Sequence, residues 1–195
     1  MKNNILTALA LLFLCHILDM GTLASRISNA ANSTDQRRAA DTCGDPSLST
    51  LYYKAFSQQG QFHGLDTESI YTHAQASTGD WVISTPAFRA WLSPGQPSTV
   101  PLYGFAGTGG LFYITSTTGT TPTAPSGFTS VGIRAYVYAT QICGSVPLYG
   151  ASLPSATDFW YTTNLNDHNS LLNLGWTDTG ITAYVLPVDT CSCSS

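Results

Sequence analysis

Charged side chains are scarce in this chain of 195 residues, in which Lys, Arg, Asp and Glu together make up 9%. From residue 39 onward the basic side chains are Lys54, Arg89 and Arg134, against nine acidic ones, a net charge of −6. Such a surface has no basic patch that could neutralise phosphate groups. The composition therefore excludes nucleic acids and anionic membrane surfaces as expected partners.

Long apolar runs are missing after the N-terminus, so no transmembrane helix is expected there. The one apolar run, from Ile5 to Leu18, follows Lys2 and is shorter than the roughly 20 residues that span a bilayer. It is typical of a signal peptide, residues 1–24, with cleavage after Ala24; a membrane anchor is the less favoured alternative. We expect a secreted, extracellular protein.

The segment of residues 25–38 is interpreted as a propeptide or linker. It ends in Arg37 and Arg38, a candidate processing site, for which an ordinary solvated arm is the alternative. Asn32 begins a sequon for N-glycosylation. Residues 39–195 are then expected to form a single domain, because their number suits one hydrophobic core.

Cysteine is also sparse, with five in the chain, and Cys15 falls in the signal peptide. The other four predict two disulfides, for which three pairings exist. We expect Cys43 to pair with Cys191 or Cys193, which would tie the ends of the domain together, and Cys143 to take the remaining partner. A metal site in the Cys-Ser-Cys tail is disfavoured, because secreted thiols are normally oxidised and no histidine lies near it.

Familiar catalytic motifs are absent: the chain has neither a G-x-S-x-G nucleophile elbow nor an H-E-x-x-H zinc helix. A polar cluster occurs in or beside residues 56–69, which the sequence predicts to be a long loop, and it consists of His63, Asp66, Glu68 and His73. These groups could bind a metal or act as acid and base, but a solvated loop is the favoured interpretation. We therefore predict a protein that is not an enzyme and needs no cofactor or metal.

A five-residue motif, Val-Pro-Leu-Tyr-Gly, occurs twice, beginning at Val100 and at Val146. The motifs that follow repeat in the same order: LFYIT and FWYTT, then GF and GW, then GIRAYV and GITAYV. A weaker third copy lies upstream and reads TLYYKAF, SIYTH, DW and FRAWL. The sequence therefore predicts three repeats, at about residues 50–92, 100–140 and 146–188.

Side-chain character alternates along residues 158–163 and 180–186, as it does in half-buried β-strands. One short helix is expected within residues 166–175, with Asp167 as its N-cap and Gly175 at its end. Each repeat is too small to bury an apolar face alone, so the three must share a core. The predicted fold is mainly β, with three pseudo-repeats in a β-trefoil-like barrel; a small propeller-like or other threefold β arrangement is the alternative.

Together these motifs resemble a repeat module of unknown function found in secreted fungal and bacterial proteins. Its pattern runs PLYR, then DHFYT, then GY, then EGIAAYV. Here PLYG at Pro101 and Pro147, DFWYT at Asp158 and GITAYV at Gly180 are similar to it, and the resemblance covers about residues 51–187. Such modules stand alone or beside hydrolases, which implies adhesion to surfaces or glycans.

The chain departs from that pattern at its polar positions. The arginine is replaced by Gly104 and Gly150, and the acid is kept as Glu68 and Asp158. The positions aligned with the histidine carry Ser69, Leu111 and Phe159. If these positions form a ligand site in related modules, that site is eroded here in at least one repeat.

Aromatic side chains are the strongest binding candidates, because their flat faces stack on sugar rings and the tips of Tyr and Trp tolerate water. Alternation puts Trp160 on one face of its strand together with Asp158, and we expect that face to be exposed. The further candidates are Glu68, Tyr103 and Tyr149, although repeated tyrosines more often pack in a core.

Two functions remain open from the sequence. The favoured one is a secreted, non-catalytic binding module for carbohydrate or cell-wall polysaccharide, in which the repeats supply several weak sites. The alternative is a structural or effector protein that binds a protein target, such as a protease, through loops at residues 56–69 and 118–127.

Overall fold

The computed structural model of the chain describes residues 42–73, 80–107 and 110–189. The predicted cleavage site at Ala24, the sequon at Asn32, the processing site at Arg38, and Cys191 and Cys193 lie outside these residues. Cys43–Ser195 form one compact unit, and its described residues are the subject below. None of the helices in the described part of the chain is long and apolar enough to cross a membrane.

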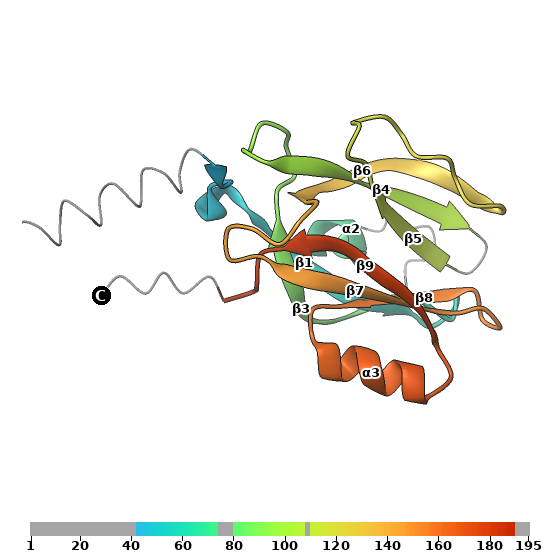
Figure 1. Ribbon diagram of the computed structural model, residues 1–195. Coiled ribbons are helices and arrows are strands. Elements are labelled where there is room, and N and C mark those ends of the chain that lie inside the picture. The colour runs from blue at the N-terminus through green and yellow to red at the C-terminus, as the bar shows by residue number, and fades with distance from the viewer. Residues whose placement is uncertain (1–41, 74–79, 108–109, 190–195) are drawn as a thin grey trace, which may run out of the picture. The chain divides into compact units, whose positions relative to one another are not determined.

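Strands dominate the described residues, which confirms the prediction of a mainly β fold (Figure 1). All pairings are antiparallel. The strands are β1 (Thr50–Ser57), β2 (Phe62–Asp66), β3 (Trp81–Ala90), β4 (Thr99–Gly107), β5 (Gly110–Thr115), β6 (Phe128–Tyr138), β7 (Val146–Leu153), β8 (Asp158–Thr162) and β9 (Thr177–Val185). The helices are short: the 3-10 helix η1 (Pro46–Leu48), α2 (Glu68–Thr72) and α3 (Leu165–Asn173).

The strands form two sheets, one of three strands in the order β2-β1-β3 and one of six in the order β5-β4-β6-β9-β7-β8. Each segment read as a repeat contributes three strands, with its first strand in the middle. β6 and β9 join at a single residue pair, Tyr138 with Tyr184. β2, β5 and β8 each pair with a neighbour on one side, so the described strands leave both sheets open and close no barrel. The barrel part of the fold prediction is therefore wrong.

The two later segments bend their strands at matching places. The register shifts after Leu102 in β4 and after Leu148 in β7, where an extra residue enters the facing strand. The facing strands β6 and β9 carry Gly132 at φ 86° and Gly180 at φ 83°, close to those bulges. A positive φ costs glycine little, since glycine has no Cβ, which accounts for the glycine that opens GIRAYV and GITAYV.

The first segment differs from its predicted layout. SIYTH forms helix α2 rather than a strand, and the strand that pairs with β1 lies earlier, at β2. Tyr71 of α2 is buried against Trp81 of β3, with ring centroids 5.0 Å apart, and this contact holds the helix on its sheet. The prediction of a long loop at residues 56–69 is therefore wrong, because a short hairpin and β2 occupy most of it.

The predicted helix in the third segment is confirmed as α3, which packs against β7 and β8 (Figure 1). Its N-cap is Asn164 rather than Asp167: the Asn164 side chain accepts hydrogen bonds from the backbone N–H groups of Asn166 and Asp167. Gly175, at φ 90°, follows the helix, as predicted.

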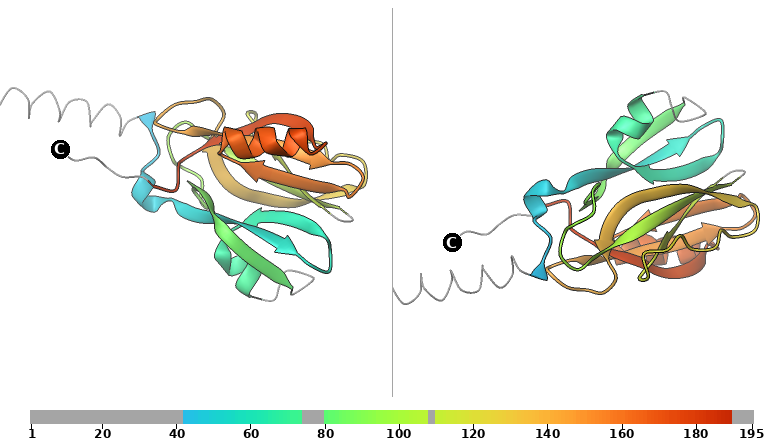
Figure 2. Two further views of the ribbon diagram at one scale, coloured as in Figure 1. Left: turned by 90° about the horizontal axis from the view of Figure 1, so that it is seen from below. Right: turned by 90° about the horizontal axis from the view of Figure 1, so that it is seen from above.

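All three segments contribute to one buried core, whose largest members include Tyr52, Phe88, Leu102, Leu148 and Val185. Figure 2 shows the three-stranded sheet facing the six-stranded one. β2, β5 and β8 contact one another there. The Tyr113 hydroxyl donates to the Leu65 carbonyl, and the Tyr113 backbone N–H donates to the Tyr161 hydroxyl at 3.1 Å. Burial raises the pKa of both tyrosines, so both hydroxyls stay protonated.

The disulfide joins Cys43 to Cys143, with the two Cα atoms 5.6 Å apart. The pairing predicted from the sequence, Cys43 with a C-terminal cysteine, is wrong. The loop between β6 and β7 brings Cys143 to the N-terminal segment, where further bonds hold the same place: Gly44 N–H donates to the Tyr138 hydroxyl at 2.8 Å, and Trp91 Nε1–H to the Asp45 carbonyl at 2.7 Å.

Candidate functional site

His63 and Asp158 form a hydrogen-bonded pair between the two sheets, because His63 lies on β2 and Asp158 begins β8. Asp158 Oδ1 accepts from the backbone N–H of His63 at 2.7 Å, and Oδ2 lies 2.6 Å from Nδ1 of the imidazole. A carboxylate can only accept, so the hydrogen-bond network assigns the proton to Nδ1. Nε2 is then the acceptor atom of the neutral ring, and it has no hydrogen-bond partner among the described residues.

Three aromatic side chains surround this imidazole. The ring centroid of His63 lies 4.4 Å from Trp160 of β8, 4.8 Å from Phe56 of β1 and 6.4 Å from Trp176, which precedes β9. All four side chains are partly exposed, whereas Asp158 is buried, with 6% of its side chain accessible. We call Phe56, His63, Trp160 and Trp176 the aromatic cluster.

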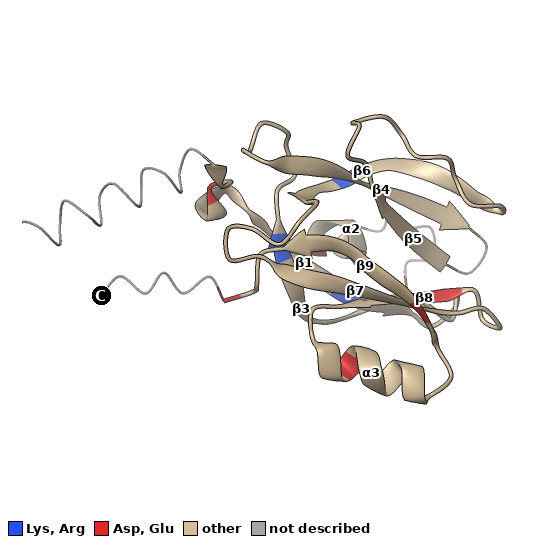
Figure 3. Cartoon of the chain, viewed as in Figure 1, with Lys and Arg blue, Asp and Glu red and all other residues tan. Residues whose placement is uncertain are grey.

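Lys54 of β1 lies beside the aromatic cluster, with its Nζ 4.9 Å from the centroid of the Trp160 ring. An ammonium over an indole face is held by a cation–π interaction. Charges are sparse along the described chain (Figure 3), and no carboxylate in it lies within ion-pair distance of Lys54. The other described basic residues are engaged: Arg134 binds Asp66, and Arg89 donates to Ser49.

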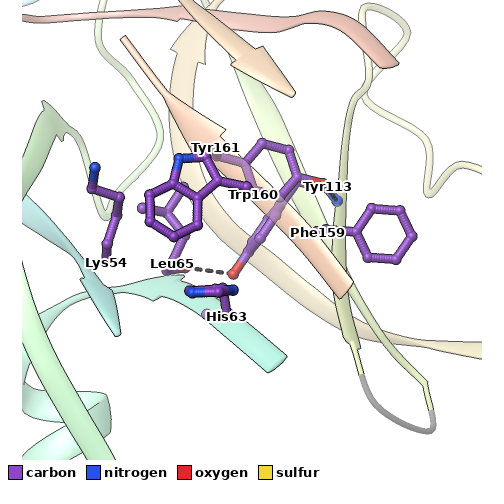
Figure 4. Close-up of a pocket in the computed structure, with 8 residues that line it drawn as sticks. Lys54, His63, Leu65, Tyr113, Phe159, Trp160 and Tyr161 are labelled. Carbon is purple, nitrogen blue, oxygen red and sulfur yellow. Dashed lines mark hydrogen bonds between the residues drawn. The ribbon is translucent and has the colours of Figure 1, made fainter. Parts of the chain in front are cut away.

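A small hollow opens beside Lys54 and two members of the aromatic cluster, His63 and Trp160 (Figure 4). Its cavity volume is about 10 Å³, which is room for one water molecule. Trp160 Nε1 is buried and has no hydrogen-bond partner among the described residues. The residues that line the hollow are Lys54, His63, Gly64, Leu65, Tyr113, Phe159, Trp160 and Tyr161.

The arrangement presents an oriented imidazole next to a cation and flat aromatic faces. The carboxylate holds His63 as it does in hydrolytic triads, but no Ser, Thr or Cys side chain in the described chain hydrogen-bonds to the imidazole as a nucleophile would. The described residues contain no group of three or more His, Cys, Asp or Glu side chains placed to hold a metal ion. The site can accept a hydrogen bond at Nε2, attract an anion at Nζ and stack on an apolar ring face.

One family model matches the part of the chain that contains the described strands. A family model described as a domain of unknown function (DUF5648) matches residues 51–186. The chain belongs to this family. The match runs from the second residue of β1 to the residue after β9, so the DUF5648 domain includes the whole candidate site and Cys143, while Cys43 precedes it. No curated protein and no solved structure matches the chain.

Of the predicted site residues, the DUF5648 domain brings Asp158 and Trp160 together at the site. The prediction that their shared strand face is exposed is wrong, because β8 faces β2 and the Asp158 carboxylate is taken up by His63. Trp160 is half-buried, since His63 covers one part of its ring and Lys54 another.

The other three predicted residues lie apart from the hollow in the DUF5648 domain. Glu68 is exposed in the first turn of α2. Tyr103 is buried, with its hydroxyl donating to the Gly119 carbonyl at 3.2 Å, and Tyr149 stacks on His168 with ring centroids 5.2 Å apart. Tyr103 thus packs inside the domain, whereas Tyr149 is partly exposed.

The loop cluster expected at residues 56–69 is dispersed. His63 turns to Asp158, whereas Asp66 binds Arg134 of β6, whose Nε lies 2.9 Å from Asp66 Oδ2. Burial raises the pKa of the Asp66 carboxyl, and the Arg134 charge opposes that rise. Burial alone would lower the pKa of Arg134, but Asp66 raises it overall. This pair ties the two sheets together inside the DUF5648 domain.

Lys54, Phe56 and Trp176 are site residues that sequence reasoning does not single out as binding groups, and it names His63 only within the polar cluster at residues 56–69. A signal for His63 exists in the spacing of the DUF5648 domain. Tyr113 lies 48 residues after Leu65 and 48 before Tyr161, and the same offset aligns His63 with Leu111 and, applied a second time, with Phe159. On β2, His63 therefore holds in the first segment the position of Leu111 and Phe159 in the other two, whereas Ser69, which the sequence aligned with them, lies in α2.

Lys54 follows from the same alignment. It pairs with Leu65 across β1 and β2, as Gly150 pairs with Tyr161 across β7 and β8. Lys54 thus holds in the first segment the register position of Gly104 and Gly150 in the other two. The DUF5648 domain carries Lys54 and His63 in one segment, and β8 brings Asp158 of another segment to them.

Proposed function

We propose that this protein is a secreted, non-catalytic module that binds carbohydrate at the aromatic cluster. The observation that carries the proposal is the hollow in which an imidazole, oriented by a buried carboxylate, lies among partly exposed aromatic rings and beside an uncompensated lysine. Sugars present apolar C–H faces and hydroxyl groups side by side, and the aromatic cluster offers a complement to each.

The size of the hollow limits what enters it. A volume of about 10 Å³ admits one oxygen atom and excludes a sugar ring. The ring would therefore lie outside, against the accessible parts of Trp160 and Trp176, and send one substituent inward. A shallow contact of this kind gives weak binding, which is typical of modules that hold a polymer surface.

We further infer that the three segments are related by a pseudo-threefold axis, without a closed barrel. Equivalent threonines link neighbouring segments. Thr115 Oγ1 of the second segment donates to the Thr182 carbonyl of the third at 3.3 Å, and Thr163 Oγ1 of the third donates to the Ala87 carbonyl of the first at 3.4 Å. The Arg134 and Asp66 pair links the first and second segments in the same circle. The binding site then lies only where the first and third segments meet. The protein would have one site for carbohydrate rather than three.

Secretion is part of the proposal. Two observations support it: the N-terminal apolar run with its small-residue cleavage site, and a disulfide, which persists in oxidising compartments.

Trp160→Ala is expected to weaken binding to an insoluble polysaccharide roughly tenfold or more, because it removes one stacking surface. Depletion of the oxidised protein, residues 39–195, by chitin, cellulose, β-glucan, peptidoglycan and acidic polysaccharides measures the effect. Trp81→Ala is the matched control: Trp81 is likewise half-buried with an unpartnered Nε1, but it packs on Phe62 and Tyr71. Equal losses in the two variants, or retention by none of the polymers, would count against the proposal.

A second candidate function, capture of a protein target such as a protease, is favoured by the loop at residues 117–127. Its first part is exposed but tethered, since Ser116 Oγ donates to the Thr120 carbonyl at 2.6 Å and Tyr103 to Gly119. A tethered exposed loop loses little entropy on binding. Inhibition of a panel of secreted proteases that disappears when this loop is shortened would favour this function over carbohydrate binding.

A further inference from the structure

We infer that the sugar recognised at the aromatic cluster is an acidic one, whose carboxylate binds Lys54 and one of whose ring hydroxyls donates to His63 Nε2. This inference rests on the proposed carbohydrate binding and names its ligand class. It assigns separate tasks to Lys54 Nζ and His63 Nε2, which have no polar partners among the described residues.

The first argument concerns Lys54. Of the Lys and Arg side chains in the described residues, Lys54 alone has neither a carboxylate within ion-pair distance nor a hydrogen bond. Arg89 donates two hydrogen bonds to Ser49, and Arg134 forms an ion pair with Asp66. From residue 39 onward the chain carries a net charge of −6, so long-range attraction of an anion is weak. A carboxylate bound at this place therefore depends on direct contact with Nζ.

The second argument concerns the protonation of the imidazole. Asp158 accepts a hydrogen bond from Nδ1–H, so Nε2 is the acceptor atom in the neutral form of the ring. An acceptor cannot bind a carboxylate oxygen, but it can receive the hydrogen of a hydroxyl group. A uronic acid presents a carboxylate and free ring hydroxyls within one sugar residue, which supplies an acceptor for Lys54 and a donor for His63.

The third argument is steric. The hollow has room for one water molecule, so a single carboxylate oxygen can enter it while the sugar ring stays outside against Trp160.

The test compares acidic polysaccharides with the same polymers after their carboxyl groups have been reduced to alcohols. Polygalacturonate, alginate and hyaluronan, each immobilised beside its carboxyl-reduced form, are offered to the full oxidised domain. We expect at least one acidic polymer to bind roughly tenfold more tightly than its reduced form, and Lys54→Gln to remove that difference. Lys54→Arg is expected to retain it, because the cation is kept.

Thr129→Glu is the matched control for net charge, since it changes the charge by the same amount on an exposed position of β6. Equal binding of acidic and reduced forms would overturn this inference and leave carbohydrate binding in place. An acid preference that survives Lys54→Gln, or that is lost equally in Thr129→Glu, would also overturn it. Failure to bind any acidic or neutral polymer would remove both the inference and the proposed function.

Discussion

Replacing Arg134 by Met is expected to lower the free energy of unfolding by about 3 kcal/mol at pH 7, because it leaves the Asp66 carboxylate buried without its cation. Arg134 keeps 23% of its side chain exposed and Asp66 keeps 8%, which places the effect at the lower end of the range for buried pairs. The Asp66 Oδ1 atom would retain its bond from the Thr67 backbone N–H at 2.8 Å, but Oδ2 would lose both bonds from the guanidinium.

The loss should depend on pH in a defined direction. Burial already raises the folded-state pKa of Asp66 above its usual 3.8, against the opposing charge of Arg134. A raised pKa means that the folded state binds the proton more tightly than the unfolded state. That contribution to stability is full below pH 3.8 and is lost as the pH rises through the folded pKa. Without Arg134 the pKa rises further, so the deficit of the variant is largest at neutral pH and shrinks on acidification.

Urea unfolding at pH 7 and at pH 4 measures both quantities. The double variant Asp66→Leu/Arg134→Met is the control, because it removes the buried charge together with its partner and is expected to be more stable than Arg134→Met alone. A deficit that stays constant between the two pH values would contradict this account of Asp66. So would a double variant no more stable than the single one.

The second large effect is expected from the disulfide. Cys43→Ser/Cys143→Ser opens a covalent loop with a sequence separation of 100 residues. Loop-closure entropy for about 100 residues predicts a loss of roughly 4 to 5 kcal/mol in the free energy of unfolding, since the cross-link restricts the unfolded chain. The N-terminal segment would then keep its hydrogen bonds to Tyr138, Trp91 and Gln96 without the covalent link.

Thermal or urea unfolding with and without dithiothreitol measures this contribution. Reductant should destabilise the parent protein by a similar amount and leave the double Ser variant unchanged. If the parent is insensitive to reductant while mass spectrometry shows the bond reduced, the expectation fails. A destabilised Ser variant that responds further to reductant would indicate that other cysteines contribute.

The sequence predicts what is local and periodic. Alternation in residues 158–163 and 180–186 identifies β8 and β9, and Gly175 marks the end of α3. The first segment differs from the alignment of its motifs for a local reason. SIYTH resembles LFYIT and FWYTT, which form strands, but in SIYTH the side chain of Tyr71 is buried as part of a helix.

The site could not be predicted because its central contact joins residues 95 positions apart. Alternation shows that Asp158 and Trp160 share a strand face, but it does not show that another strand covers that face. The disulfide has the same origin, since the two cysteines meet through the path of the β6–β7 loop rather than through the order of the repeats.

The meeting of β2, β5 and β8 has a consequence for solubility. Unpaired strand edges are templates on which other chains can add strands and aggregate. Here side chains from neighbouring edge strands hydrogen-bond to such backbone groups. The Tyr113 hydroxyl donates to the Leu65 carbonyl, the Tyr161 hydroxyl accepts from the Tyr113 N–H, and the Asp158 carboxylate accepts from the N–H of His63. The Asp158 contact that orients the His63 imidazole therefore also covers part of the β2 edge. A mutation of Asp158 would leave that backbone N–H free to pair with another chain, as well as disturb the site.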